Sequence, residues 1–216
     1  MPYSLNFAEN DCLFPTALGA YHVACTRQPE RVRRFLFMLM KNDQAANVSQ
    51  VDINTWAEQF GIDYEEMLDF LYMLQELNFI EVLADADHVP MGPLEQILPP
   101  RLTAFSGSGR ALLSDRQGLY IANVGFAHET AEELSALAAD MAALHERHRY
   151  LVNSNLGLKM GAWGLLNARG NSQIGFWPIY IDSTEFNLVI ADAPYLNQRA
   201  FRDLIWILSR RYSDDG

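Results

Sequence analysis

Cysteine is scarce in this sequence of 216 residues, which contains only Cys12 and Cys25. The two lie near the amino terminus and form no CxxC pair. A disulfide framework or a structural zinc site needs more ligands at short, regular spacings. The sequence therefore predicts neither, and we expect both thiols to be buried or idle.

Long apolar runs are missing as well. No run reaches the roughly 18 residues that a membrane-spanning helix needs, and the first residues lack the basic and apolar regions of a signal peptide. We therefore expect a cytoplasmic protein without membrane insertion. Aromatic residues are plentiful, with 12 Phe, 9 Tyr and 4 Trp, which is enough material for compact cores.

Basic residues are outnumbered, with 16 Lys and Arg against 27 Asp and Glu, a formal net charge of −11. The imbalance belongs to the first half: up to Pro90 there are 14 acidic and 5 basic residues, and from Met91 onward 13 and 11. A protein of this charge is repelled by phosphate backbones unless it carries a strong basic patch. No such patch is evident, so we expect no nucleic-acid partner.

Catalytic signatures are absent too. The histidines of His145-Glu-Arg-His148 are three residues apart, whereas the HExxH zinc motif needs four. No GxSxG nucleophile elbow occurs. The Gly107-Ser-Gly109 turn precedes a predicted strand and has no following Lys, so it does not match a phosphate-binding loop. These absences predict a protein that is not an enzyme and holds no metal or cofactor.

Residues 29 to about 83 predict three helices. The first begins at Pro29 and Glu30, the second runs from Ile53 to Phe60, and the third follows Asp63. Asp63 and Glu66 have the spacing of a capping box. From Asp63 to Glu76 there are five acidic residues and no Lys or Arg.

The segment 53–82 resembles the helix-turn-helix and first wing strand of winged-helix domains. The residues that carry this resemblance are Ala57, Gly61 and Ile62 at the turn, Leu68, Leu71 and Leu74 on the third helix, and Asn78 to Val82. A winged helix that reads DNA needs basic or amide side chains on its third helix. Because this helix is acidic, the domain is expected to bind protein or to be structural. A docking mode through Arg31, Arg33, Arg34 and Lys41 on the first helix is left open.

The sequence divides into two predicted domains, 1–88 and 105–216. Between them, residues 89–104 include Pro90, Gly92, Pro93, Pro99 and Pro100, which predict a linker. Leu94 to Leu98 is expected to form at most a short helical piece within it.

The second half predicts a five-stranded sheet with a long helix between its second and third strands. The predicted strands are 110–115, 119–124, 159–167, 172–181 and 186–191, and the long helix runs from Glu129 to about His148. Asn197 is predicted to cap a last helix whose face is made by Phe201, Leu204, Ile205, Leu208 and Tyr212.

Two stripes run along the long helix. One is apolar and is expected to lie on the sheet: Leu134, Leu137, Ala138, Met141, Leu144 and His148. The other is made of small residues that either face water or let another helix approach closely. With the glycines of Met160-Gly-Ala-Trp-Gly164 it forms a predicted dimer interface: Ala131, Ser135, Ala139, Ala142, Met160, Ala162 and Trp163.

The order strand, strand, long helix, three strands, helix resembles that of roadblock domains. The residues also look similar: Ala111 to Ala122, Glu129 to Ala139, Phe176 to Ile179 and Leu188 to Ala191. The resemblance covers residues 93–212 and implies a five-stranded antiparallel sheet with helices on both faces, in a dimer formed through the central strand and long helix. Pro99-Pro100 is expected to break the leading helix of that fold.

The fold class expected is thus α+β, with a small helical winged-helix-like domain before the roadblock-like domain. The roadblock resemblance implies a non-catalytic dimeric adaptor or regulator, a platform for a small Ras-like GTPase or for a motility or secretion component. Glu65, Glu66 and Asp69 on the acidic helix are the predicted partner-binding residues. A transcription regulator is one alternative. Another is a small-molecule sensor, whose cavity would be lined by Trp163, Phe176, Trp177 and Tyr180.

Overall fold

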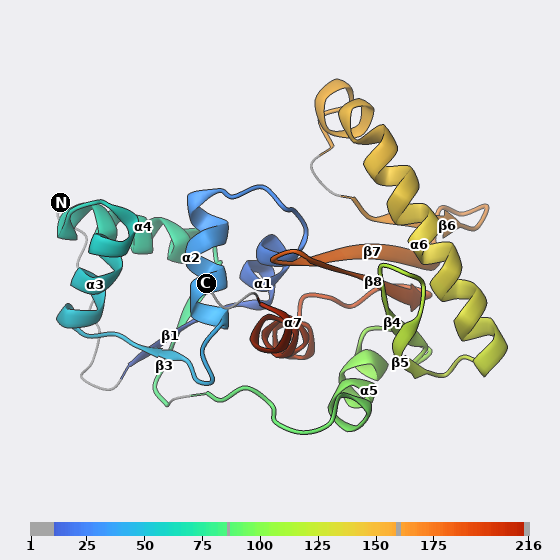
Figure 1. Cartoon of the computed structure of the whole chain (residues 1–216), viewed down its shortest axis with the longest axis horizontal. Coiled ribbons are helices and arrows are strands. Elements are labelled where there is room, and N and C mark those ends of the chain that lie inside the picture. The colour runs from blue at the N-terminus through green and yellow to red at the C-terminus, as the bar shows by residue number, and fades with distance from the viewer. Residues whose placement is uncertain (1–10, 86, 159–160, 214–216) are drawn as a thin grey trace.

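The computed structural model describes residues 11–85, 87–158 and 161–213 of the chain, and Figure 1 shows how they are arranged. The protein is α+β, as predicted. None of the helices in these residues has both the length and the apolar character that crossing a bilayer requires.

The first half is a group of four helices and a small antiparallel sheet of order β2-β1-β3. Its elements are β1 (Cys12–Pro15), α1 (Ala17–Ala24), α2 (Arg31–Met40), β2 (Ala46–Asn47), α3 (Gln50–Phe60), α4 (Tyr64–Glu76) and β3 (Ile80–Leu83). The capping box predicted at Asp63 and Glu66 is present and begins α4. Gly61 ends α3 with a φ of 66°, in the left-handed region that glycine adopts without strain.

Three elements of this half were not predicted: the strand β1, the helix α1 and the short strand β2. Thr16 begins α1 by accepting a hydrogen bond from the Gly19 backbone. A side chain at Gly19 would lie 2.0 Å from the Phe79 carbonyl oxygen, so this glycine allows α1 to approach the chain just before β3. The winged-helix interpretation remains a prediction. The strand that follows α4 is β3, which lies at an edge of the small sheet, whereas β1 is the middle strand.

The prediction of a linker at residues 89–104 is wrong for the second part of this segment. Residues Leu94–Ala104 form the helix α5, which continues through Pro99 and Pro100. Leu98 and Leu102 on this helix are fully buried, and α5 contacts β5 and α7. Burial of these leucines outweighs the two backbone hydrogen bonds that the prolines remove.

The second half contains an antiparallel sheet of order β5-β4-β8-β7-β6, which confirms the predicted five strands. Its strands are β4 (Ala111–Asp115), β5 (Tyr120–Val124), β6 (Trp163–Leu166), β7 (Ser172–Ile181) and β8 (Thr184–Ala191). The helix α6 (His128–Tyr150) continues into a π-helical segment, η1 (Leu151–Asn155), and α7 (Arg199–Tyr212) follows the sheet. In Figure 1, the C-terminal part of α6 and η1 extend beyond the sheet.

Alternate residues of the strands pack on opposite faces of this sheet. Leu112, Val189 and Phe176 form one cross-strand row and pack with Ala131 and Ala138 of α6. The neighbouring row, Leu113, Leu188 and Trp177, packs in the larger core together with α5 and α7. Helices therefore cover both faces, as predicted.

The last helix, α7, is buried on all sides from Phe201 to Ser209. Sequence analysis gave it a single buried face, and the structure corrects this because the first half covers its other side. The Trp206 indole donates a hydrogen bond of 2.7 Å to the Asn42 carbonyl oxygen. The centroid of its ring lies 4.1 Å from the centroid of the Phe14 ring. Figure 1 shows α7 between the two halves of the molecule.

The predicted cap of this helix is wrong as well. The N-cap residue of α7 is Gln198, not Asn197, and its side chain caps no backbone N–H. Instead the Gln198 amide donates hydrogen bonds to the carbonyl oxygens of Ala104 and Tyr195. The helix start is therefore held by the end of α5.

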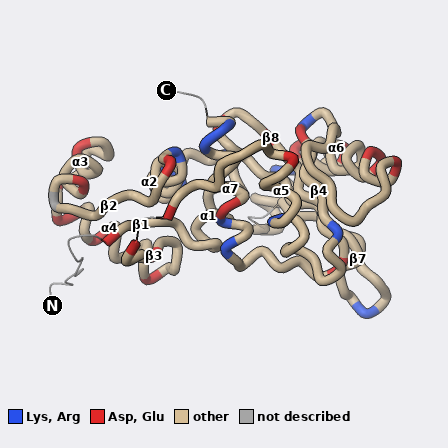
Figure 2. The backbone as a smooth tube through the Cα atoms, turned by 90° about the horizontal axis from the view of Figure 1, so that it is seen from below, with Lys and Arg blue, Asp and Glu red and all other residues tan. Residues whose placement is uncertain are grey.

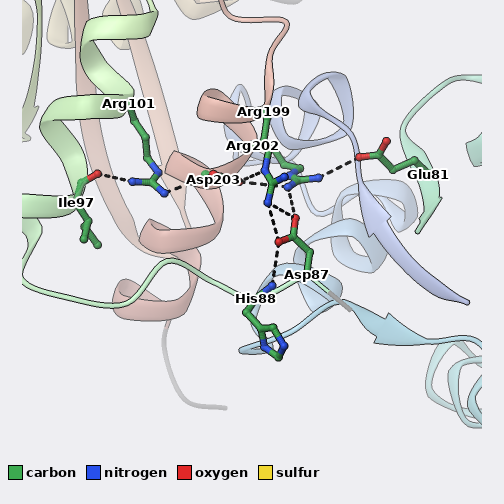
Figure 3. Close-up of polar contacts among 8 residues, drawn as sticks. All are labelled: Glu81, Asp87, His88, Ile97, Arg101, Arg199, Arg202 and Asp203. Atoms are coloured by element: carbon green, nitrogen blue, oxygen red, sulfur yellow. Dashed lines mark hydrogen bonds and ion pairs between the residues drawn. The ribbon is translucent and has the colours of Figure 1, made fainter. Parts of the chain in front are cut away.

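A network of charges joins α7 to the first half (Figure 3). Arg202, with a side chain only 5% exposed, lies 3.1 Å from Glu81 and 2.5 Å from Asp87. Arg199 donates to both oxygens of the same Asp87 carboxylate, at 2.8 and 2.9 Å. Arg101 of α5 lies 3.5 Å from Asp203, so the network reaches three separate parts of the chain.

We predict that Arg202→Ala lowers the free energy of unfolding by about 3 kcal/mol, because it leaves the Asp87 and Glu81 carboxylates without their most buried partner. Chemical denaturation of the full chain measures this loss. Arg199→Ala is the matched control, since its side chain is 69% exposed and an exposed ion pair contributes about 0–1 kcal/mol. Equal losses in the two variants would contradict a structural role for the buried network.

Candidate functional site

The long helix α6 lies on its own sheet through its small residues. Ala131 and Ser135 have no exposed surface and Ala138 is 1% exposed, while Leu137 is 40% exposed and His148 is exposed. A side chain at Gly118, in the turn between β4 and β5, would lie 3.2 Å from the Ser135 carbonyl oxygen. The small side chains thus allow close contact between the helix and its own sheet.

This arrangement changes the predicted roles of part of each stripe, while Leu134 and Ala138 of the apolar stripe pack on the sheet as predicted. Ala131 and Ser135, which were predicted to face a partner, are buried within the chain. Leu137 and His148, which were predicted to face the sheet, point away from the core. Ala139 and Ala142 are half-buried on the flank of the helix. The small-residue pattern was real, but it could not indicate which surface the helix approaches.

The strand β6 forms an edge of the sheet, because β7 is its single neighbour among the described strands. Its sequence, Trp163-Gly-Leu-Leu166, contains no charged residue or proline, which are the usual protections of an exposed edge. Leu165 is 59% exposed and Leu166 is 63% exposed. The outer side of this strand pairs with no other described strand, and its exposed side chains are apolar.

Sequence analysis placed Ala162 and Trp163 near this edge but missed Leu165 and Leu166. The structure shows Ala162 exposed and Trp163 half-buried. Met160, the remaining predicted interface residue, lies outside the described residues. The sequence does contain a signal that could have identified these two leucines, since they form an apolar pair directly before the turn at residues 167–170.

A hydrogen bond ties β6 to α6. The Trp163 indole donates to His145 Nδ1 at 3.3 Å, and His145 is only 7% exposed. Burial is the main cause that lowers the pKa of His145 below its ordinary value of 6.5. The ring is therefore neutral near pH 7, with its proton on Nε2 because Nδ1 accepts from the indole.

The three predicted partner-binding residues are exposed on one helix of the first half. Glu65, Glu66 and Asp69 all lie on α4, and none is buried. Glu66 has a second role, because its carboxylate accepts a hydrogen bond from the Asp63 backbone in the capping box. Figure 2 shows acidic residues gathered over α3 and α4.

The four aromatic residues predicted to line a ligand cavity do not meet in one place. Phe176 is buried between the sheet and α6, whereas Trp177 packs in the core on the other face. Trp163 is at the edge strand. Tyr180 lines a cavity near the loop of residues 25–29.

No cluster of three His, Cys, Asp or Glu side chains that could hold a metal ion occurs among the described residues. Cys12 and Cys25 form no disulfide. The surfaces that remain as candidates are the β6 edge and the acidic face of α4.

We predict that acidification destabilises the fold through His145. Below pH 6.5 the unfolded chain protonates this imidazole while the folded chain, with its lowered pKa, does not, so stability falls as the pH drops from 6.5 toward the folded-state pKa. His145→Gln should flatten this part of the stability profile, measured by urea unfolding at a series of pH values. His148→Gln, an exposed change on the same helix, should not; an unchanged slope in His145→Gln would refute the assignment.

The comparisons with known proteins concern the sequence and the fold. No protein-family model matches the sequence, and no curated protein matches it. Several solved structures are similar to a little more than half of the chain, among them the following three. A roadblock/LC7 domain from Streptomyces avermitilis is 13% identical with a TM-score of 0.38, covering 56% of this chain and 96% of its own.

The gliding protein MglB from Thermus thermophilus is 17% identical with a TM-score of 0.36, covering 59% of this chain and 96% of its own. MglB from Myxococcus xanthus is 13% identical with a TM-score of 0.32, covering 54% and 88% respectively.

Proposed function

We propose that this chain is a non-catalytic adaptor that forms a homodimer through the edge strand β6 and the flank of α6. The observation that supports this most directly is the unprotected β6 edge with its two exposed leucines. Edges of this kind pair readily with another chain unless they are covered. In a two-fold symmetric dimer both protomers contribute the same surface patch. The β6 edge of one protomer would therefore pair with the β6 edge of the other.

The residues proposed for this interface follow from their exposure. Leu165, Leu166 and Ala162 are exposed at the edge strand, and Leu137, Ala139 and Ala142 are at least partly accessible on α6. Ala131 and Ser135 drop out of the predicted interface because they are fully buried. The proposed interface is thus more leucine-rich than the sequence indicated.

The proposed partner is another protein, which meets a surface made by both protomers. The roadblock resemblance of the sequence suggests a small Ras-like GTPase or a motility or secretion component for this role. Glu65, Glu66 and Asp69 would add a second contact by attracting a basic patch on that partner. The charge network at Arg202 supports this division of roles, because it holds the acidic half against α7.

One of the basic residues on which the DNA-binding alternative depended is not available at the surface. Arg33, which sequence analysis considered as a phosphate contact, is 8% exposed. Its guanidinium donates to the carbonyl oxygens of Val23 at 2.8 Å and Tyr180 at 3.4 Å. It is therefore occupied within the fold, and the acidic α4 remains without basic residues.

We predict that Leu165→Asp weakens the dimer about tenfold or more, because it places a charge in the apolar centre of the proposed interface. Sedimentation equilibrium of the full chain across a micromolar concentration series measures the dissociation constant. Val51→Asp is the matched control, since Val51 is 72% exposed on α3, away from the sheet. A wild-type chain that stays monomeric throughout the series would overturn the proposal.

The acidic face is tested with a partner captured by affinity purification and identified by mass spectrometry. Glu65→Lys combined with Asp69→Lys should slow association and reduce its dependence on salt, because screening weakens steering between charges. Glu66 is left unchanged because it caps α4. Stopped-flow kinetics at several salt concentrations give the rates.

Glu129→Lys with Glu133→Lys makes the same charge change on exposed positions of α6 and serves as the control. If both pairs slow association equally, the effect belongs to net charge and the α4 face has no specific role.

A further inference from the structure

The end of α6 and the turn that follows it carry exposed apolar side chains. Four large ones lie within nine residues: Tyr150 is 76% exposed, Leu151 47%, Leu156 60% and Leu158 56%. We call these four residues the apolar tip. Figure 1 shows that this part of the chain extends away from the sheet. A single exposed apolar residue needs no explanation, whereas a group of them marks an interaction site.

The backbone of the apolar tip is held in a closed turn. The Leu156 amide donates to the Leu151 carbonyl oxygen and the Leu158 amide donates to the Val152 carbonyl oxygen, both at 3.0 Å. Gly157 has a φ of 66°, which lets the chain reverse here without strain. Val152 is 8% exposed and anchors the turn to the fold. Two backbone N–H groups of the tip are therefore already paired, which favours contact with an apolar medium, where unpaired groups are costly.

Acidic residues are scarce around the apolar tip. From Arg147 to Ile181 the sequence contains four basic residues and none that is acidic. Arg147 is exposed and forms no ion pair with any described residue. Two carboxylates near this end of α6 are each paired with an arginine, Glu146 with Arg149 and Glu185 with Arg27. These pairs add little net charge, so the local charge at the tip is small and, through Arg147, positive.

The acidic elements of the chain lie away from the tip. Figures 1 and 2 show α3 and α4 at the opposite end of the long axis from α6. On α6, the first acidic residue before Glu146 is Asp140, ten residues before Tyr150, or about 15 Å along the helix axis. The Debye length at physiological ionic strength is about 8 Å. Repulsion between these carboxylates and an anionic surface at the tip is therefore largely screened.

The size of the apolar tip favours a lipid surface over a protein partner. A standard protein interface uses about 20–30 residues on each side and needs a matching shape, whereas the tip offers four apolar side chains at the end of a helix. A bilayer interface needs no matching shape, since it accepts leucine side chains at its acyl boundary and tyrosine at the headgroups. A basic side chain such as that of Arg147 is attracted to anionic headgroups.

We propose that the apolar tip is a peripheral membrane contact, which inserts Leu151, Leu156 and Leu158 into the interface of an anionic bilayer and places Tyr150 and Arg147 at the headgroups. The contact touches one face of a membrane and needs no spanning helix. It departs from the sequence-based expectation of no membrane insertion, which rested on the lack of a spanning segment. The inference goes beyond the adaptor function and does not depend on the dimer.

Flotation of the full chain with phosphatidylcholine vesicles that contain phosphatidylserine tests the proposal. We expect the chain to float with the vesicles and to be released in part by salt, because screening weakens the electrostatic part of the contact. Leu156→Asp should lower the partition coefficient about tenfold or more, since a carboxylate would have to enter the interface. Val51→Asp, the same kind of change at a 72% exposed position of α3, should leave it within about twofold. Absence of flotation, or equal losses in the two variants, overturns the proposal.

Tryptophan fluorescence then locates the contact. Leu156→Trp adds an indole at the tip, and its emission should be quenched by vesicles with brominated acyl chains. Val51→Trp adds the indole on α3 and should show no quenching beyond that of the wild type. Quenching that is equal in the two variants would mean that another surface meets the lipid, which overturns the proposal. So would a fall in sedimentation mass caused by Leu156→Asp without vesicles, because the tip would then be covered by a second copy.

Discussion

The burial of α7 on all sides is the constraint on which the rest of the structure depends. An ordinary surface helix buries one stripe and leaves the other face to water, but this one has the sheet on one side and the first half of the chain on the other. Its Arg202 must therefore find carboxylates inside the interface, and Glu81 and Asp87 supply them. Apolar packing gives the contact its area, and the charges fix its orientation.

The same constraint determines where the candidate surfaces lie. Helices α7 and α5 pack on one face of the sheet, α6 packs on the other, and β6 lies at an edge of the described sheet. The acidic α4 belongs to the half that is held through Arg202, so its exposed carboxylates have a defined position relative to that edge. The junction between the halves also creates the cavity beside Tyr180. The candidate surfaces and this cavity thus follow from one packing arrangement.

The parts of the fold that sequence analysis predicted well are those governed by local pattern. The strand β7 has the predicted bounds, Ser172–Ile181. The prediction was possible because alternation along the strand and turn residues on both sides define it locally. The capping box at Asp63 is likewise a local signal. By contrast, β1 is a strand of four buried residues, Cys-Leu-Phe-Pro, without alternation, and its pairing with β2 and β3 depends on distant residues. The helix α5 was missed because tertiary burial of Leu98 and Leu102 overrides its two prolines.

The candidate site shows the same limit at the level of single residues. Small residues on a helix reveal that something approaches closely, but the periodicity is identical whether the neighbour is the chain's own sheet or another molecule. Here Ala131 and Ser135 face the sheet. The residues of α6 that stay exposed include Leu137, and the edge strand β6 ends in two exposed leucines. A dimer built on these surfaces would gain its stability mainly from leucine burial and strand pairing, and not from close helix contact.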